Sequence, residues 1–302
     1  MKENRKLGIA AIMGVVLISG VAYISKEIIV DYLNPIDVVA LQLIIMATLL
    51  TAYNLVRKNS FTIDKKNLLM IVISGLFGTT FFNLFSVISI SYIGGTVSSL
   101  LFGLAAVLSL MIEFVFYKRK RTKLSILSVG LSLVGVYILM GLNPADLLGT
   151  NLIGYFLSFV SIIAWVLFCF FTDQISNAFE KTVVLNYQAL VGVLTTMPFL
   201  FVYPVSFSQL VNPSVIINMI VLGVLNATVA YFLCIYAVQN IGLTFSNLLM
   251  NFFPVVTVIV TFLIYGTMPS VNQMIGGLII LISVVILNQD QKNLTQLKAV
   301  ET

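Results

Sequence analysis

The chain has 302 residues and a mass of 33.2 kDa, with 60% hydrophobic and only 9% charged residues. Because soluble chains carry about a quarter charged residues, this composition excludes a soluble protein and predicts an integral membrane protein. The net charge of +5 therefore gives no sign of nucleic-acid binding. Histidine is absent, which excludes histidine-based triads, metal sites and proton relays. The two cysteines form no CxxC pattern, so we expect no metal site and no cofactor.

Apolar stretches long enough to cross a membrane follow one another along the chain. A helix needs about 20 apolar residues to cross the hydrocarbon core. The first stretch follows basic residues, as a signal sequence does, but it is long for one and lacks a good cleavage site, so we interpret it as a retained helix. The ten predicted spans are 7–25, 35–56, 68–90, 95–117, 124–142, 151–171, 183–205, 214–238, 242–266 and 270–288.

The basic residues indicate the orientation of these spans. With the N-terminus in the cytoplasm, only Lys26 of the 16 Lys and Arg residues falls on the outer side. Because basic residues concentrate in cytoplasmic loops, we predict a multi-pass protein of the cell membrane with both termini in the cytoplasm. Lys26 and Glu27 end the first span, and we interpret them as interfacial anchors, with a gate at the outer mouth as the alternative.

The sequence contains an internal repeat. Residues 75–117 align without a gap with residues 223–265 at an offset of 148 (223 minus 75). Each half holds an odd number of predicted spans, so the second half enters the membrane inverted. The identical pairs are Gly75/Gly223, Thr80/Thr228, Ile93/Ile241, Gly94/Gly242, Thr96/Thr244, Ser98/Ser246, Leu100/Leu248, Leu101/Leu249, Val107/Val255, Phe114/Phe262 and Tyr117/Tyr265. At an offset of 146, Gln42 falls on Gln188, and Lys26-Glu27 on Thr172-Asp173.

These two segments, with the glycine-rich last span, resemble the EamA-type transporters of the drug/metabolite transporter superfamily. The resemblance covers nearly the whole chain. It implies an all-α membrane fold of ten transmembrane helices in two inverted five-helix halves, a central cavity, and alternating access. The first, third and fourth helices of each half do most of the lining in that family. We expect one half over residues 1–145, the other over 146–290, and a short cytoplasmic tail over 291–302.

Uncharged polar residues within the spans are the candidate binding groups. Asn247 and Asn251 are four residues apart and therefore share a helix face. An amide facing lipid is costly, so this face either lines a cavity or bonds to a neighbouring helix. We favour the cavity. The further candidates for its wall, for which close packing is the alternative, are Asn83, Tyr231, Trp165, Asn226, Ser19 and Tyr23.

Glu113 is the main acidic candidate within a span. An ionisable residue in a membrane span is a functional hypothesis by default, here a site for a coupling proton or cation. Glu113 also lies little more than one turn from Lys118, at the cytoplasmic end of its helix. We therefore favour an interfacial ion pair and keep coupling as the alternative.

The sequence thus predicts a secondary transporter and no enzyme. No ATP-binding motif is present, and the expected cavity holds amides, hydroxyls and aromatics without a fixed counter-charge. We expect a neutral or zwitterionic metabolite as substrate, such as an amino acid, a related compound or an amphipathic drug, and export as the direction. The expected partners are this substrate, the lipid bilayer and no nucleic acid, while a coupling proton or other ion and a homodimer stay open. The alternatives are an uptake permease and a non-transporting scaffold or sensor.

Overall fold

Helices account for the fold, and the described residues contain no strand. Helices are expected here, because the hydrocarbon core offers the backbone no partner and a helix bonds its own amides. The structure is a computed structural model that describes residues 2–117, 123–139, 151–176, 179–202, 207–250 and 252–300. The first half contains α1 (Lys2–Ile29), α2 (Pro35–Arg57), α3 (Lys65–Gly75), η1 (Leu76–Phe81), α4 (Phe82–Leu101), α5 (Leu104–Tyr117) and α6 (Lys123–Leu139). The second half contains α7 (Asn151–Ser176), α8 (Lys181–Val202), α9 (Phe207–Leu210), α10 (Pro213–Met219), η3 (Ile220–Ala230), α11 (Tyr231–Ile241), α12 (Leu243–Met250), α13 (Phe253–Tyr265) and α14 (Val271–Val300).

Several of these helical runs are long and apolar enough to cross a membrane. By length and composition, 6 runs in the described part of the chain qualify, and 253–265 and 271–283 are shorter apolar helices. The all-α membrane fold is thereby confirmed, while the count of ten spans stays a prediction. The six runs are Arg5–Ile29, Pro35–Arg57, Lys65–Leu101, Leu152–Ile175, Lys181–Phe201 and Pro213–Ile241.

The two halves break their helices at equivalent glycines. Gly94 has φ 77° and ψ 160°, and Gly242 has φ 86° and ψ 158°. Only glycine adopts this conformation readily, because a side chain would clash with the backbone. A π-helix precedes each break in the same span, η1 in the first half and η3 in the second. The sequence repeat is therefore also a repeat of backbone geometry.

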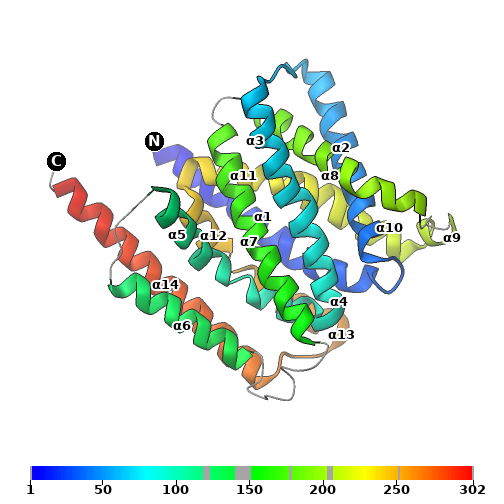
Figure 1. The fold of residues 1–302 in the computed structure, drawn as a ribbon. Coiled ribbons are helices and arrows are strands. Elements are labelled where there is room, and N and C mark those ends of the chain that lie inside the picture. The colour runs from blue at the N-terminus through cyan, green and yellow to red at the C-terminus, as the bar shows by residue number, and fades with distance from the viewer. Residues whose placement is uncertain are drawn as a thin grey trace.

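The helices of one half pack mainly against helices of the other half. Two of the closest pairs, α6 with α14 and α2 with α8, join helices that are equivalent in the repeat. Two others, α4 with α7 and α1 with α11, correspond to each other, because the repeat relates α1 to α7 and α4 to α11. Figure 1 shows α6 and α14 side by side along one flank. This pattern is expected of two inverted halves related by a pseudo-twofold axis. The start of α1 and the end of α14 lie at the same end of the bundle (Figure 1), as an even number of crossings requires.

Candidate functional site

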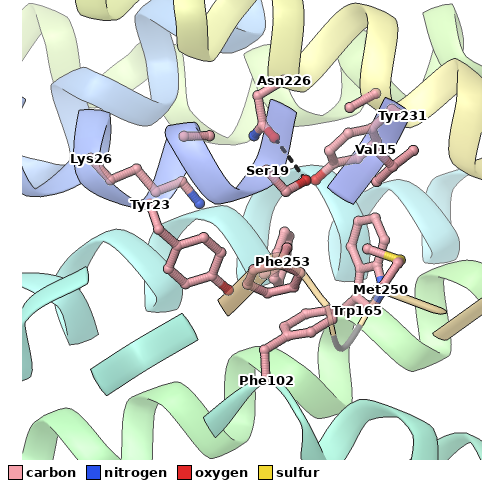
Figure 2. A pocket seen from close by; sticks show the side chains of 13 residues that line it. Val15, Ser19, Tyr23, Lys26, Phe102, Trp165, Asn226, Tyr231, Met250 and Phe253 are labelled. Carbon is pink, nitrogen blue, oxygen red and sulfur yellow. Dashed lines mark hydrogen bonds between the residues drawn. The ribbon is translucent and has the colours of Figure 1, made fainter. Parts of the chain in front are cut away.

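A small cavity lies between the two halves, deep in the bundle (Figure 2). Its volume of about 20 Å³ holds roughly one water molecule. The side chains around it come from α1, α4, α7, η3, α11, α12 and α13, together with the break after α4. Its lining residues are Val15, Ser19, Ala22, Tyr23, Lys26, Phe82, Phe102, Trp165, Asn226, Ala230, Tyr231, Met250 and Phe253.

The two halves contribute repeat-equivalent positions to the wall of this cavity. Several lining residues form pairs at repeat-equivalent positions, so both halves contribute the same helix faces to one wall. The pairs are Ser19 with Trp165, Phe82 with Ala230, and Phe102 with Met250. A cavity at the junction of inverted halves is where secondary transporters place their substrate sites.

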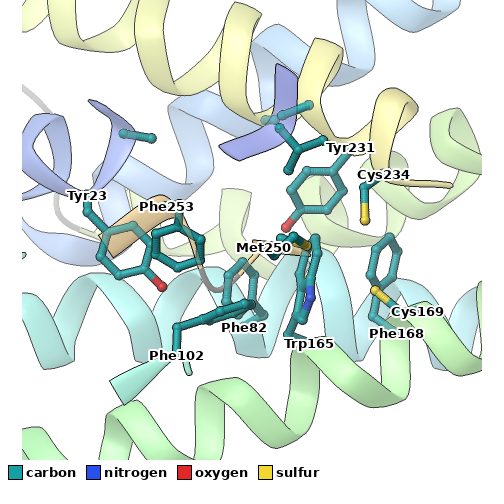
Figure 3. Close-up of a cluster of buried hydrophobic side chains, with 14 of the residues drawn as sticks. Tyr23, Phe82, Phe102, Trp165, Phe168, Cys169, Tyr231, Cys234, Met250 and Phe253 are labelled. Carbon is teal, nitrogen blue, oxygen red and sulfur yellow. The ribbon is translucent and has the colours of Figure 1, made fainter. Parts of the chain in front are cut away.

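Aromatic rings close the cavity at both ends (Figure 3). At one end the rings of Tyr23 and Phe253 stack with their centroids 5.0 Å apart. At the other end the ring of Tyr231 meets those of Trp165 at 5.4 Å and Phe168 at 5.3 Å. The cavity is therefore occluded, with an apolar wall and a few polar atoms.

Five of the predicted site residues line this cavity. Ser19, Tyr23, Trp165, Asn226 and Tyr231 all lie on its wall. The Ser19 hydroxyl donates a 3.4 Å hydrogen bond to Asn226 Oδ1, which joins the two halves (Figure 2). The structure thus brings together candidate residues that lie far apart in the sequence.

Two other predicted residues, Asn83 and Asn247, lie behind the wall. Trp165 Nε1 donates to Asn247 Oδ1 at 3.1 Å, and Asn247 Nδ2 donates to Ser109 Oγ at 2.9 Å. Asn83 Nδ2 donates to the Tyr231 hydroxyl at 2.9 Å. Both amides are almost fully buried. They are satisfied by the side chains in front of them, so they orient the rings of the wall instead of forming it.

The remaining two candidates are not placed by the structure. Asn251 lies outside the described residues, between α12 and α13. Glu113 belongs to α5, but its side chain and Lys118 lie outside what the structure describes. The binding role of Asn251 and the two interpretations of Glu113 stay predictions.

The expectation of a cavity without a fixed charge is wrong, because Lys26 lines the cavity. Its side chain lies in the cavity wall and is only 1% exposed. The predicted first span ends at residue 25, but α1 continues to Ile29, so Lys26 lies one turn inside the helix. Two signals were available: Lys26 is the one basic residue off the cytoplasmic side, and it extends the Ser19–Tyr23 face by three residues.

A wide vestibule opens beyond the Tyr23–Phe253 stack, at the end of the bundle away from the termini. Its volume is about 630 Å³. Glu27 Oε2 accepts a 2.8 Å hydrogen bond from the Gly95 amide, just after the first glycine break. Thr96 and Thr261 bond to each other across it at 2.8 Å. We call this space the Glu27 vestibule; its wall includes Glu27, Asp31, Gly94, Thr96, Thr261, Tyr265 and Gln273.

The repeat-equivalent place at the other end is closed. A narrow pocket there, the Asp173 pocket, leaves no room for a water molecule, at about 0 Å³. Its wall contains both cysteines, and both are buried free thiols. The lining residues are Cys169, Thr172, Asp173, Cys234, Ile235 and Val238. Among the described residues, the end with Glu27 is therefore hollow, whereas the Asp173 pocket is packed.

A helical membrane bundle of two inverted halves around a central cavity is a recurring architecture of secondary transporters. The sequence matches the EamA-like transporter family over residues 6–141 and again over residues 152–289. The chain belongs to this family.

Two similar proteins are named as transporters. The uncharacterized transporter YdfC of Bacillus subtilis (strain 168) is 24% identical over 223 residues, which cover 72% of this chain and 70% of YdfC. An uncharacterized transporter of Archaeoglobus fulgidus is 21% identical over 268 residues, 88% of this chain and 93% of that protein. A protein crystal structure with 16% identity superposes with a TM-score of 0.66 over 97% of this chain and 99% of its own, and shares the fold.

Proposed function

We propose that this protein is a secondary transporter that moves a small metabolite with an apolar body across the cell membrane by alternating access. The observation that carries the proposal is the occluded cavity between inverted halves, with a hollow mouth at one end and a packed mouth at the other. The family membership and the names of the relatives support transport over an enzymatic function.

The geometry supports a simple opening step. The cavity holds about one water molecule in this arrangement, so a metabolite enters only when the rings of Tyr23 and Phe253 part. This stack lies between the cavity and the Glu27 vestibule. When the two halves then swap conformations, the Asp173 pocket would open and the vestibule would close. The glycine breaks at Gly94 and Gly242 are natural places for such bending.

We propose that both termini are cytoplasmic, which makes the Glu27 vestibule the outer mouth, and that transport in the cell is export. The placement of the basic residues supports the first point. A Lys120→Cys variant in a Cys169→Ala/Cys234→Ala background should resist a membrane-impermeant thiol reagent in intact cells and react after permeabilisation. Efficient labelling of intact cells would contradict this topology.

The test of transport is flux into proteoliposomes. We expect saturable, counterflow-stimulated uptake of at least one compound from a panel of amino acids, organic acids and amphipathic drugs. Ala22→Phe, which fills the cavity, should abolish that flux. Leu194→Phe, on a side chain 75% exposed on α8, is the matched control and should transport normally.

A protein without flux for any compound of the panel would favour the scaffold or sensor alternative. Flux that Ala22→Phe leaves unchanged would show that transport does not use this cavity. Net flux under imposed gradients in each direction then separates export from uptake, since topology alone does not set direction.

A further inference from the structure

The Lys26 amine is buried and has few partners. It donates one hydrogen bond to Ser86 Oγ at 3.1 Å. The rings of Tyr23 and Phe82 lie 5.5 Å and 5.2 Å from the nitrogen, within the range of cation–π contacts. An ammonium has three N–H donors, so the Ser86 bond leaves most of its capacity unused. Figure 2 shows the amine pointing between the two halves toward the cavity.

No carboxylate in the described part of the chain forms an ion pair with Lys26. The neighbouring Glu27 is turned away, because its carboxylate accepts the hydrogen bond of the Gly95 amide at 2.8 Å. Asp31 and Glu27 both line the vestibule on the far side of the aromatic stack. A buried charge without a counter-charge is costly, and within a membrane span such residues mark a ligand or ion path.

We propose that the Lys26 ammonium binds the carboxylate of the transported metabolite. The substrate class is then small monocarboxylic acids with an apolar or aromatic body, amino acids with such side chains included. This inference rests on the proposed transport function and names the substrate class of the same cavity. This proposal excludes purely neutral and cationic compounds as substrates, because a neutral compound would leave the buried ammonium unpaired and a cation would be repelled by it.

The rest of the cavity suits the other parts of such a molecule. The rings of Phe82, Phe102 and Trp165 lie within about a ring's width of one another, with centroids 4.8–6.3 Å apart, and offer an apolar surface for its body. The paired Ser19 hydroxyl and Asn226 carbonyl offer a polar edge for an amine or hydroxyl group. Lys26 is the sole cation among the lining residues, so a second carboxylate would find no partner there.

The chain supplies its own reporter for the test. Trp165 is the single tryptophan, and its ring lines the cavity. Purified full-length protein in detergent is titrated with 3-phenylpropanoate, phenylalanine, 3-phenylpropanamide and phenylethylamine, and the Trp165 emission is followed. We expect the two carboxylates to bind at least tenfold more tightly than the amide and the amine. Equal or tighter binding of the amide or the amine, or no binding by either acid, would overturn the proposal.

Variants of Lys26 test the named contact directly. Lys26→Met keeps the length of the side chain without the charge and should weaken binding of the acids at least tenfold while leaving the weak amide binding unchanged. Lys26→Arg should retain the preference for acids. Lys66→Met, on an exposed lysine of α3, is the matched control and should behave as the wild type. Acid binding by Lys26→Met at wild-type strength would refute the contact, and the wild-type comparison of probes remains decisive where a variant fails to fold.

The outcomes separate this inference from the transport function. Lysine-dependent binding of acids without flux in proteoliposomes would leave the inference standing and contradict transport. Saturable flux of the amide or amine without a preference for acids would leave transport standing and contradict the inference.

Discussion

The segment around Lys26 and Glu27 and the Asp173 pocket occupy equivalent places in the two inverted halves, yet the first opens into the Glu27 vestibule and the second leaves no room for a water molecule. The lysine of the first has a threonine as its counterpart, and Thr172 accepts a 2.8 Å hydrogen bond from Gln188 in the core. The equivalent residues are Tyr23 and Cys169, Lys26 and Thr172, Glu27 and Asp173, and Ser86 and Cys234. The shared backbone therefore sets where the mouths lie, and the side chains of each half decide the charge and the room.

The comparison also separates what opens from what binds. The aromatic stack and the threonine pair at the vestibule end are contacts between helices of different halves, which a change of conformation must break. Lys26 bonds to Ser86 within its own half, and we expect this contact to persist when the halves move. The following experiments probe the two mouths from the largest expected effect to the smallest.

The strongest test is to lock the open mouth. Thr96 and Thr261 bond across the vestibule between α4 and α13. We expect Thr96→Cys/Thr261→Cys, in a background without the native cysteines, to form a disulfide on oxidation and lose all flux, because the two halves can no longer separate there. Reduction should restore flux, and each single variant should transport under oxidising conditions. Full flux at complete cross-linking would show that this pair is not part of the gate.

The two glycine breaks test whether the halves are energetically equivalent. We expect Gly94→Ala and Gly242→Ala each to lower the unfolding free energy by about 1–3 kcal/mol, since both impose the same disallowed backbone conformation on a side chain. Neither new Cβ meets an atom closer than 3.5 Å, so sterics do not confuse the comparison. Denaturant titration in detergent measures the change.

The control for this pair is Gly130→Ala. Gly130 lies within α6, and a Cβ at this position would meet nothing within 4 Å, so alanine should be neutral or stabilise by about 0.4–1 kcal/mol. Clearly unequal losses of unfolding free energy at Gly94 and Gly242 would mean that the two breaks contribute differently to stability despite their matching backbone angles.

Much of this arrangement could be predicted from the sequence, because membrane spans and internal repeats leave strong signals. The repeat aligned Gly94 with Gly242, where both helices break, and the search for polar and aromatic residues within spans selected Trp165 and Tyr231, which line the cavity. A helix face is set by a periodicity that residues alone reveal.

The depth of a residue behind that face could not be predicted in the same way. Asn247 belongs to a face directed toward the centre, but the indole of Trp165 stands in front of it and takes its carbonyl oxygen. Which of two facing side chains reaches the cavity depends on the distance between helices, and no spacing encodes that distance. Lys26 was misplaced for a related reason, since the last turn of α1 lies beyond the predicted span.

The residues behind the wall make a smaller, sharper prediction. Asn247→Ala should weaken ligand binding roughly threefold to tenfold, by the about 0.5–1.5 kcal/mol of a hydrogen bond that fixes Trp165. The Trp165 emission of the free protein should shift as well, because its Nε1–H loses its acceptor. Ser109→Ala, which removes the other partner of Asn247, is the control and should leave the Trp165 emission nearly unchanged. Equal spectral shifts in both variants would argue against a specific role for the Asn247–Trp165 bond.

The smallest effect is expected at the packed mouth. By the offset of 148, the threonine pair of the vestibule corresponds to Thr244 (96 plus 148) and Glu113 (261 minus 148). Glu113 thus stands where a gate residue stands in the other half, but it also lies beside the basic segment that begins at Lys118. The ion pair that we favour for Glu113 would be exposed, and exposed pairs contribute about 0.2–1 kcal/mol. We therefore expect Glu113→Gln to transport at the wild-type rate with its pH dependence intact and to lose no more stability than that. A selective loss of pH-driven flux in Glu113→Gln, with ligand binding unchanged, would instead make Glu113 the coupling site and add a second acidic group to Asp173 at the packed mouth.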